Sequence, residues 1–173
     1  MTAVRRLRQG VRALLAFAQP VDYALAAEYL GPPLLARFRQ MRRSEQLHSL
    51  RVLRALLAEG DVSHDLAVAA LLHDGGQPLD AMPLWQRSRP VIVRRLSPQL
   101  LLRLSQGDPR SRWRRGFVVY VQHPAWSAEL IRRGGGDEAA VWLSAHHADG
   151  LSAWYDRPLA GHLARLQAAD DVN

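Results

Sequence analysis

The chain of 173 residues contains no cysteine, and all of its 23 basic residues are arginines, so lysine is absent as well. Without thiolates the sequence excludes cysteine nucleophiles, iron–sulfur clusters and cysteine-bound zinc. It also lacks a run of about 18 apolar residues, which excludes a membrane-spanning helix. Any metal site must therefore use histidine, aspartate and glutamate, so the 7 histidines are the first candidates for metal ligands.

The arginines outnumber the acidic residues and give a formal net charge of +7. Because Ala, Leu, Gly and Arg dominate as they do in a GC-rich coding sequence, the arginine content partly reflects codon usage. Two interpretations stay open, a solvated basic surface and a surface that steers anionic substrates toward a site. We expect no membrane partner. Nucleic-acid binding through the arginine-rich segment 110–115 is disfavoured, since only charge supports it, and the sequence leaves a homo-oligomer open.

The length and the 48% of hydrophobic residues predict a single globular domain. The hydrophobic period is helical along most of the chain, which predicts an all-α fold. Helices are expected at 4–18, 21–30, 34–60, 63–74, 124–133, 137–147 and 158–171. Prolines interrupt residues 75–116, where we expect one or two short helices. At 117–121 a helix is favoured over a strand, because no second strand of similar quality exists to pair with it.

The first expected helix imitates a signal peptide, because three arginines precede its apolar run. Arg12 interrupts that run, however, and no small-residue cleavage signal follows closely. An amphipathic helix at 4–18 and a cytoplasmic protein are therefore the expectation.

The dipeptide His73-Asp74 ends a segment, 66–72, that is apolar on every side and is therefore expected to be a buried helix. Ser63 is a plausible N-cap for this helix, with Asp65 in its first turn. A buried carboxylate at the other end requires a cationic partner. Two alternatives stay open: an arginine pairs with Asp74 while His73 bonds a carbonyl, or both residues bind a metal ion.

Further ligand-type side chains lie at or near the ends of other apolar segments, namely His48, His123, His146, His147 and Asp170. Asp170 continues the helix face of Leu163 and Leu166, whereas Asp171 points about 100° away. A lone histidine at a helix end most simply interacts with the helix dipole. Five histidines and two aspartates in such places instead indicate a site for divalent Zn, Mn, Fe, Co or Ni.

Together these residues resemble the HD-domain superfamily of metal-dependent phosphohydrolases. The resemblance spans residues 44–171, and the stretches that carry it are 47–52, 69–76, 123–124, 146–150 and 166–170. It implies an HD-type helical bundle at 41–173. Residues 1–40 gain nothing from the resemblance, and we expect them to form an N-terminal helical extension packed on that core.

The resemblance also implies a ligand set and a reaction. It places a first divalent ion on His48, His73, Asp74 and Asp170. It makes Asp74 the catalytic, bridging carboxylate, with His123, His146 and His147 available to a second ion. Two ions are expected, drawn from Mn, Fe, Co, Ni, Zn or Mg. The implied activity is hydrolysis of a nucleotide or related small anionic phosphoester by attack of metal-bound hydroxide.

The chain departs from the family's pattern at several positions. Gln77 stands where lysine is usual, Ala148 replaces the acidic residue after the histidine pair, and 150–152 does not read Gly-Tyr-Pro. A cyclic-di-GMP phosphodiesterase of the HD-GYP type is therefore disfavoured. The alternative function is a non-catalytic HD scaffold that binds a nucleotide or a protein partner.

Two groups of arginines are candidates for binding substrate phosphate or stacking a base: the pair Arg94-Arg95 and the run Arg110, Arg112, Arg114 and Arg115 around Trp113. The alternative for both groups is a solvated loop, and it is the interpretation that we favour.

Overall fold

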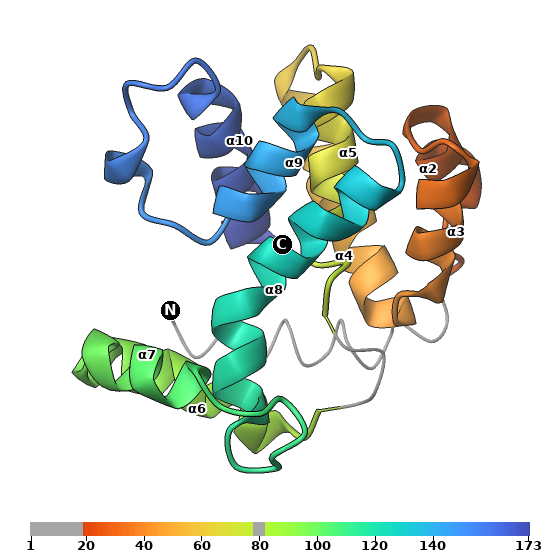
Figure 1. Ribbon diagram of the computed structural model, residues 1–173. Helices are drawn as coiled ribbons and strands as arrows, with labels where there is room; N and C mark the ends of the chain where they lie inside the picture. The colour runs from red at the N-terminus through yellow and green to blue at the C-terminus, as the bar shows by residue number, and fades with distance from the viewer. Residues whose placement is uncertain (1–18, 78–81) are drawn as a thin grey trace.

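The computed structural model describes residues 19–77 and 82–173. Within those ranges every regular element is a helix and no strand is found, which confirms the predicted all-α class. Figure 1 shows the helices gathered into one body, with a hairpin of two green helices at its edge. The helix expected at 4–18 lies outside the described residues.

Two helices replace the single helix expected at 34–60. They are α3 (Pro32–Gln40) and α4 (Arg43–Glu59). The expectation is wrong because the backbone leaves the helical conformation at Met41 and Arg42, whose ψ angles are 155° and 144°. The hydrophobic pattern continues across this turn, so helical periodicity alone does not reveal it.

Side chains of α4 stabilise the turn. The Gln46 amide donates hydrogen bonds to the carbonyl oxygens of Phe38, at 2.8 Å, and Arg39, at 3.0 Å. The Glu45 carboxylate accepts one from the backbone N–H of Arg42. The last carbonyls of one helix and the first N–H of the next therefore both find partners.

The expected short helices of 75–116 are present as α6 (Leu84–Leu96) and α7 (Pro98–Ser105). They pack on each other and on α8 (Arg115–Arg133). The main hydrophobic core draws on the other helices and includes no residue of α6 or α7 among those described. The two helices therefore form a lobe beside the bundle (Figure 1).

α8 runs without a break through Pro124. Residues 117–121 are helical as predicted, but the expectation that a separate helix begins at Pro124 is wrong. A proline removes the N–H that would bond the carbonyl of Tyr120. The ring of His123 takes its place, since Nδ1 lies 3.1 Å from that oxygen and 3.1 Å from the carbonyl oxygen of Val119. The same contact that preserves the helix fixes the histidine.

The C-terminal part of the chain forms α9 (Glu138–His146), a 3₁₀ turn (Leu151–Ala153) and α10 (Ala160–Val172). These helices confirm the ones expected at 137–147 and 158–171, with ends shifted by up to two residues. Asp137 stands at the N-cap of α9 as predicted, although its side chain makes no capping hydrogen bond.

α5 (His64–Leu72) lies at the centre of the bundle, where α4, α9, α10 and α2 (Tyr23–Tyr29) pack on it. Ser63 caps it as predicted, because its hydroxyl accepts from the N–H of Leu66. All seven residues of 66–72 are buried, none more than 1% exposed. The buried helix predicted from the sequence is confirmed, and His73 and Asp74 follow directly after its C-terminal end.

Residues 19–40 pack on this bundle, since Ala26 of α2 and Leu34 and Phe38 of α3 belong to its core. A boundary between residues 40 and 41 stays a prediction. No helix in the described ranges is long and apolar enough to cross a membrane.

Replacing Gln46 with leucine tests the turn between α3 and α4. We expect Gln46→Leu to lower the free energy of unfolding by about 1–3 kcal/mol, because two carbonyls lose their donor at a side chain that is only 3% exposed. Urea denaturation measures the loss. Gln40→Leu is the matched control, since Gln40 is exposed and its side-chain oxygen accepts from Arg37 on the same helix. Equal losses in the two variants would contradict the role given to Gln46.

Candidate metal centre

Five helices bring ligand-type side chains to one place, the point where α5 ends. The members are His48 of α4, His73 and Asp74 after α5, His123 of α8, His147 after α9 and Asp170 of α10. Each was predicted from the sequence, and together they are six of the seven predicted ligands.

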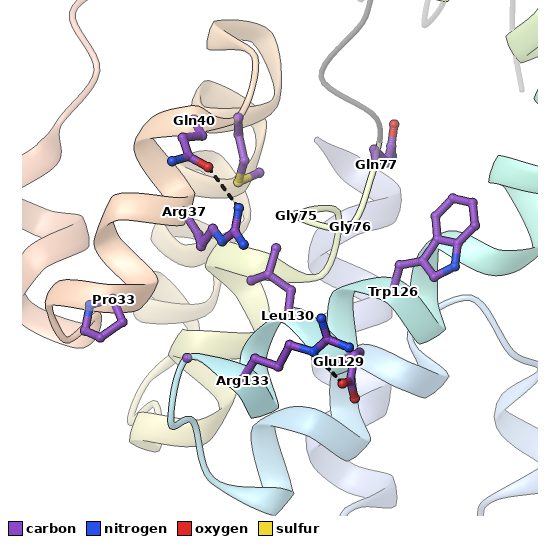
Figure 2. A pocket seen from close by; sticks show the side chains of 12 residues that line it. Pro33, Arg37, Gln40, Gly75, Gly76, Gln77, Trp126, Glu129, Leu130 and Arg133 are labelled. Carbon is purple, nitrogen blue, oxygen red and sulfur yellow. Dashed lines mark hydrogen bonds and ion pairs between the residues drawn. The ribbon is translucent and has the colours of Figure 1, made fainter. Parts of the chain in front are cut away.

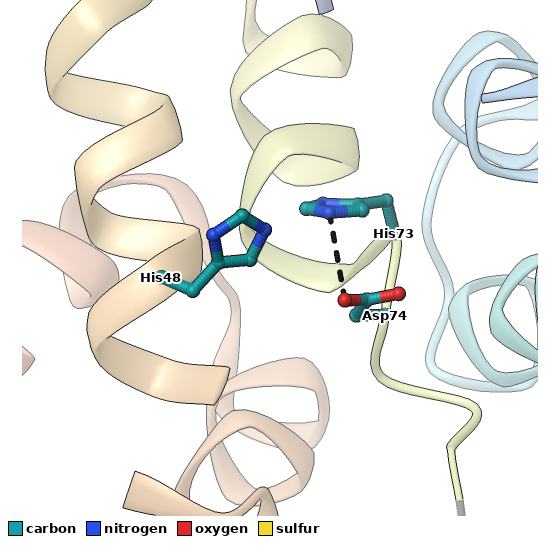
Figure 3. Close-up of side chains that lie close together, drawn as sticks. All are labelled: His48, His73 and Asp74. Carbon is teal, nitrogen blue, oxygen red and sulfur yellow. Dashed lines mark ion pairs between the residues drawn. The ribbon is translucent and has the colours of Figure 1, made fainter. Parts of the chain in front are cut away.

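Three of them, His48, His73 and Asp74, form a first group whose ligand atoms all lie within 4.8 Å of one another. Figure 3 shows His48 on its helix opposite the two residues that follow α5. Asp170 joins this group, because its Oδ1 lies 2.8 Å from Nε2 of His48 and 3.6 Å from Nε2 of His73. Two imidazoles and two carboxylates therefore surround one small volume.

Asp74, His123 and His147 form a second group within the same 4.8 Å limit. Oδ1 of Asp74 lies 3.4 Å from Nε2 of His123, and the Nε2 atoms of the two histidines are 3.2 Å apart. The other oxygen of Asp74, Oδ2, lies 3.9 Å from Nε2 of His73. Asp74 thus presents one carboxylate oxygen to each group.

Three of the rings are held by their other nitrogen. Nδ1 of His73 lies 3.0 Å from the carbonyl oxygen of Ala70, and Nδ1 of His147 lies 2.8 Å from that of Ser144. His123 makes the equivalent contact within α8. Because a carbonyl can only accept, each Nδ1 carries a hydrogen. Nε2 is therefore turned toward Asp74, as it is in metal-ligating histidines.

The first group balances opposite charges, and its members range from His73, whose side chain is 1% exposed, to Asp170, whose side chain is 36% exposed. Burial opposes a charge on His73, but Asp74 and Asp170 outweigh it and raise the pKa of His73 to about 9. Burial also opposes a charge on Asp74, yet the surrounding imidazoles lower its pKa to about 2. Burial also opposes a charge on Asp170, but the hydrogen bond from His48 and the nearby charge of His73 outweigh it and hold the pKa of Asp170 well below its usual range.

His147 behaves differently from His73. Burial, followed by repulsion from His73, lowers the pKa of His147 to about 4. Its ring is neutral at physiological pH, with the Nε2 lone pair available. Nε2 of His73 is itself buried without a hydrogen-bond partner. Such an orphaned donor or acceptor requires an explanation, and a bound cation supplies one.

Gly76 sets the distance between the end of α5 and α8. Its N–H donates to Oγ of Ser127 at 2.9 Å, one helical turn beyond His123. A Cβ on Gly76 would lie 2.7 Å from the Cβ of Trp126, so only glycine permits this approach. The loop is thereby pressed against α8, which places Asp74 next to His123.

The structure does not place the remaining predicted ligand, His146, in either group. Its Nδ1 lies 2.7 Å from Oδ2 of Asp149. Its ring contacts Trp142 and Trp154, with centroid distances of 4.8 Å and 4.1 Å. Adjacent helical residues point about 100° apart, so the turn that directs His147 inward directs His146 outward.

A cleft of about 450 Å³ opens onto the cluster. Its walls include Asp74, His123, His147 and Asp170, together with Arg94 and Tyr120. Nη1 of Arg94 donates to the hydroxyl of Tyr120 at 3.1 Å. Of the arginines singled out in the sequence, only Arg94 lines this cleft. Sequence reasoning missed Tyr120, although its position three residues before His123 on the same helix face was a usable signal.

Sequence reasoning also missed Glu45, a carboxylate one turn before His48 that is 7% exposed. Burial outweighs the neighbouring Arg42 and raises its pKa, and the charge of Asp74 adds to the effect. Its ion pairs with Arg42, at 3.2 Å, and Arg87, at 3.5 Å, tie the turn before α4 to α6.

A cavity of about 530 Å³, larger than the cleft, lies elsewhere, between α3 and α8 on the side of the Gly75-Gly76 loop. Figure 2 shows Arg37 and Gln40 on one wall and Glu129 and Arg133 on the other, each pair hydrogen-bonded internally. None of the clustered histidines or aspartates lines it. Cavity size alone therefore does not locate the metal-ligand cluster.

No protein-family model matches the chain. No curated protein and no solved structure matches it either. The geometry of the cluster and the residues that line the cleft are therefore the features from which a function can be inferred.

The raised pKa of His73 predicts how stability depends on pH in chelator-treated protein. Its imidazolium contributes stability in full below the unfolded pKa of about 6.5, and that contribution is lost as the pH rises through about 9. Asp74 stays ionised throughout this interval, since its pKa is about 2. We therefore expect the melting temperature to fall between pH 6.5 and 9, and saturating Mn²⁺ to abolish that fall.

His162→Gln is the control for this measurement, because His162 belongs to none of the groups of described residues that could hold a metal ion and should leave the effect of Mn²⁺ unchanged. Asp170→Asn should flatten the slope, since it removes one of the two carboxylates that raise the pKa of His73. A melting temperature that rises over the same interval would contradict the charge balance described above.

Proposed function

We propose that the chain is a metal-dependent phosphohydrolase of the HD type that acts on a nucleotide or a related small anionic phosphoester. The observation that carries the proposal is the position of Asp74 between two groups of ligand atoms at the base of a cleft lined by Arg94. The absence of cysteine and the mixture of imidazole and carboxylate favour Mn, Fe, Co, Ni or Zn over softer metals.

The residues present fit a pair of divalent ions. His48, His73, Asp170 and one oxygen of Asp74 would hold the first ion, and His123, His147 and the other oxygen of Asp74 the second. His146 has no part in this assignment. When bound, such ions supply water of lowered pKa and neutralise phosphate charge. The buried Nε2 of His73, which lacks a hydrogen-bond partner, is the feature that best supports the fit.

The protein's own groups would bind and orient the ester. The guanidinium of Arg94 can pair with phosphate oxygens, and the Tyr120 hydroxyl that it contacts can donate to the same group. A second cavity of about 320 Å³ shares Tyr120 and His123 with the cleft. It would accept the remainder of the substrate against Met82, Val119 and Gln77.

One observation favours the alternative of a non-catalytic binding module. Gln77 lines the second cavity without the charge that a lysine would add. Arg87 lines the same cavity and supplies a cation there. We therefore place the enzyme first, and metal uptake without turnover would support the binding module.

The metal count can be measured by calorimetric titration of chelator-treated protein with Mn²⁺ or Co²⁺. We expect two binding events in the wild type. His123→Ala should remove the weaker event and keep the tighter one, because His123 belongs only to the second group. His146→Ala, which alters the neighbour of His147 outside both groups, should keep both. A single event that His123→Ala leaves untouched would contradict the two-ion assignment.

Hydrolysis is tested with bis(p-nitrophenyl) phosphate, p-nitrophenyl phosphate and a panel of nucleotides, each with Mn²⁺, Co²⁺, Ni²⁺ or Mg²⁺. We expect Asp74→Asn to lower kcat/KM by more than about 100-fold, because even a partner of a ligand commonly contributes 10- to 100-fold. Asp156→Asn is the matched control and should retain activity, since Asp156 is exposed and belongs neither to the ligand groups nor to the walls of the cleft.

Arg94→Gln separates substrate binding from metal binding. It should raise KM by about 10-fold while leaving metal uptake unchanged, whereas the neighbouring Arg95→Gln should affect neither. Metal uptake by the wild type with no turnover on any ester would contradict the enzymatic proposal.

A further inference from the structure

α6 has two faces of different character. Arg87 and Arg94, seven residues apart, share the face that lines the two cavities beside the metal-ligand cluster. Trp85, Ile92 and Leu96, spaced by seven and four residues, share a face about 140–200° away around the helix. These three side chains are 41%, 57% and 80% exposed. An amphipathic helix normally buries its apolar face, and here that face is turned to solvent.

A cluster of aromatic rings and an arginine extends the exposed face. Trp113, which is 71% exposed, lies with its ring centroid 5.8 Å from that of Trp85. The guanidinium carbon of Arg89 lies 5.4 Å from the Trp85 centroid and 5.3 Å from the Trp113 centroid. Two amphipathic aromatic rings and a cation are thus held together at the edge of the lobe.

The net charge of the chain is concentrated in this lobe and in the segment that connects it to α8. Residues 84–115 contain nine arginines and one acidic residue, Asp108, which gives this segment a net charge of +8. The other residues contain 14 arginines and 15 acidic residues. The segment is therefore strongly basic, and the remainder of the chain is close to neutral.

We infer that this lobe docks on an anionic lipid surface, with Trp85, Trp113, Ile92 and Leu96 entering the interface and with arginines of 84–115 other than Arg87 and Arg94 contacting lipid phosphates. Exposed tryptophan and aliphatic side chains within a basic segment are what such a surface binds. A second copy of the chain would bring two segments of +8 together and is disfavoured by repulsion. A nucleic acid would use the arginines and the two rings but would leave Ile92 and Leu96 in water.

The docking requires no membrane-spanning helix. The expectation of no membrane partner followed from the lack of a long apolar run, and that argument concerns a span and not contact with a surface. Because the docking face points away from Arg94, the cleft stays open when the lobe is bound. The inference rests on exposure and charge, so it stands or falls independently of metal binding and hydrolysis.

Sedimentation with vesicles tests the inference on the full chain. We expect binding to vesicles that contain phosphatidylglycerol, at least 10-fold weaker binding to pure phosphatidylcholine vesicles, and loss of binding as salt is raised. The variants Ile92→Ser and Leu96→Ser, singly and together, should weaken binding at least 10-fold in the double variant. Their circular dichroism and Mn²⁺ uptake should equal those of the wild type, which excludes misfolding.

Tyr155→Ser is the control, because Tyr155 is 73% exposed but lies outside the lobe. It should bind vesicles as the wild type does, whereas Trp113→Ser should bind them more weakly. Equal affinity for neutral and anionic vesicles, or no binding to either, would overturn the inference. So would tight binding of single-stranded oligonucleotides that Trp113→Ser abolishes and the Ile92/Leu96 double variant keeps, or a dimer in sedimentation velocity that the double variant dissociates.

Discussion

The arrangement of the centre depends on one constraint, which is that the carboxylate of Asp74 emerges from a helix buried on every side and must have its charge balanced there. An unpaired charge in such a place is costly, and the neighbouring side chains that the described residues offer are imidazoles. In the metal-free protein the balance is reached by keeping a proton on His73, whose pKa rises to about 9. A divalent cation would satisfy the same carboxylates and release that proton. The cluster is therefore suited to exchange one kind of positive charge for another without rearranging the core.

Orientation of the imidazoles does not depend on a bound ion, because the backbone provides it. His73 and His147 each follow a helix and bond the carbonyl three residues earlier. His123 reaches the same result differently, through the carbonyl that Pro124 leaves without an amide partner. Three local solutions thus turn three Nε2 atoms toward one carboxylate. Side chains fixed in this way would lose little conformational freedom on binding a cation, which would favour affinity.

Local signals made α5 and its cap predictable, since burial on every side is visible in the composition of 66–72 and Ser63 is a strong N-cap residue. The residues at the centre were predictable because ligand-type side chains at the ends of apolar helices are rarely explained by surface exposure.

The break between α3 and α4 was not predictable, because it depends on Gln46 reaching back to the carbonyl oxygens of Phe38 and Arg39. Nor could the sequence distinguish His146 from His147, since the choice depends on how far α9 rotates before it ends. The prediction that a helix begins at Pro124 failed for a similar reason. The His123 side chain contacts the carbonyl that the proline leaves without an amide partner, so α8 continues.

The charge of the chain shows why composition alone is a weak guide to partners. A total of +7 distributed evenly would be an ordinary solvated surface, and codon usage would account for it. The charge is instead concentrated in residues 84–115, beside the exposed side chains of Trp85, Ile92 and Leu96. The segment therefore combines positive charge with exposed apolar surface. Because α6 presents Arg94 to the cleft on its opposite face, one helix separates the two roles of its arginines. In the two proposals, the arginines on the cavity side would bind a small anion, and those around the exposed stripe would contact an extended anionic surface. The helical period thereby allows a single basic segment to serve both without competition between them.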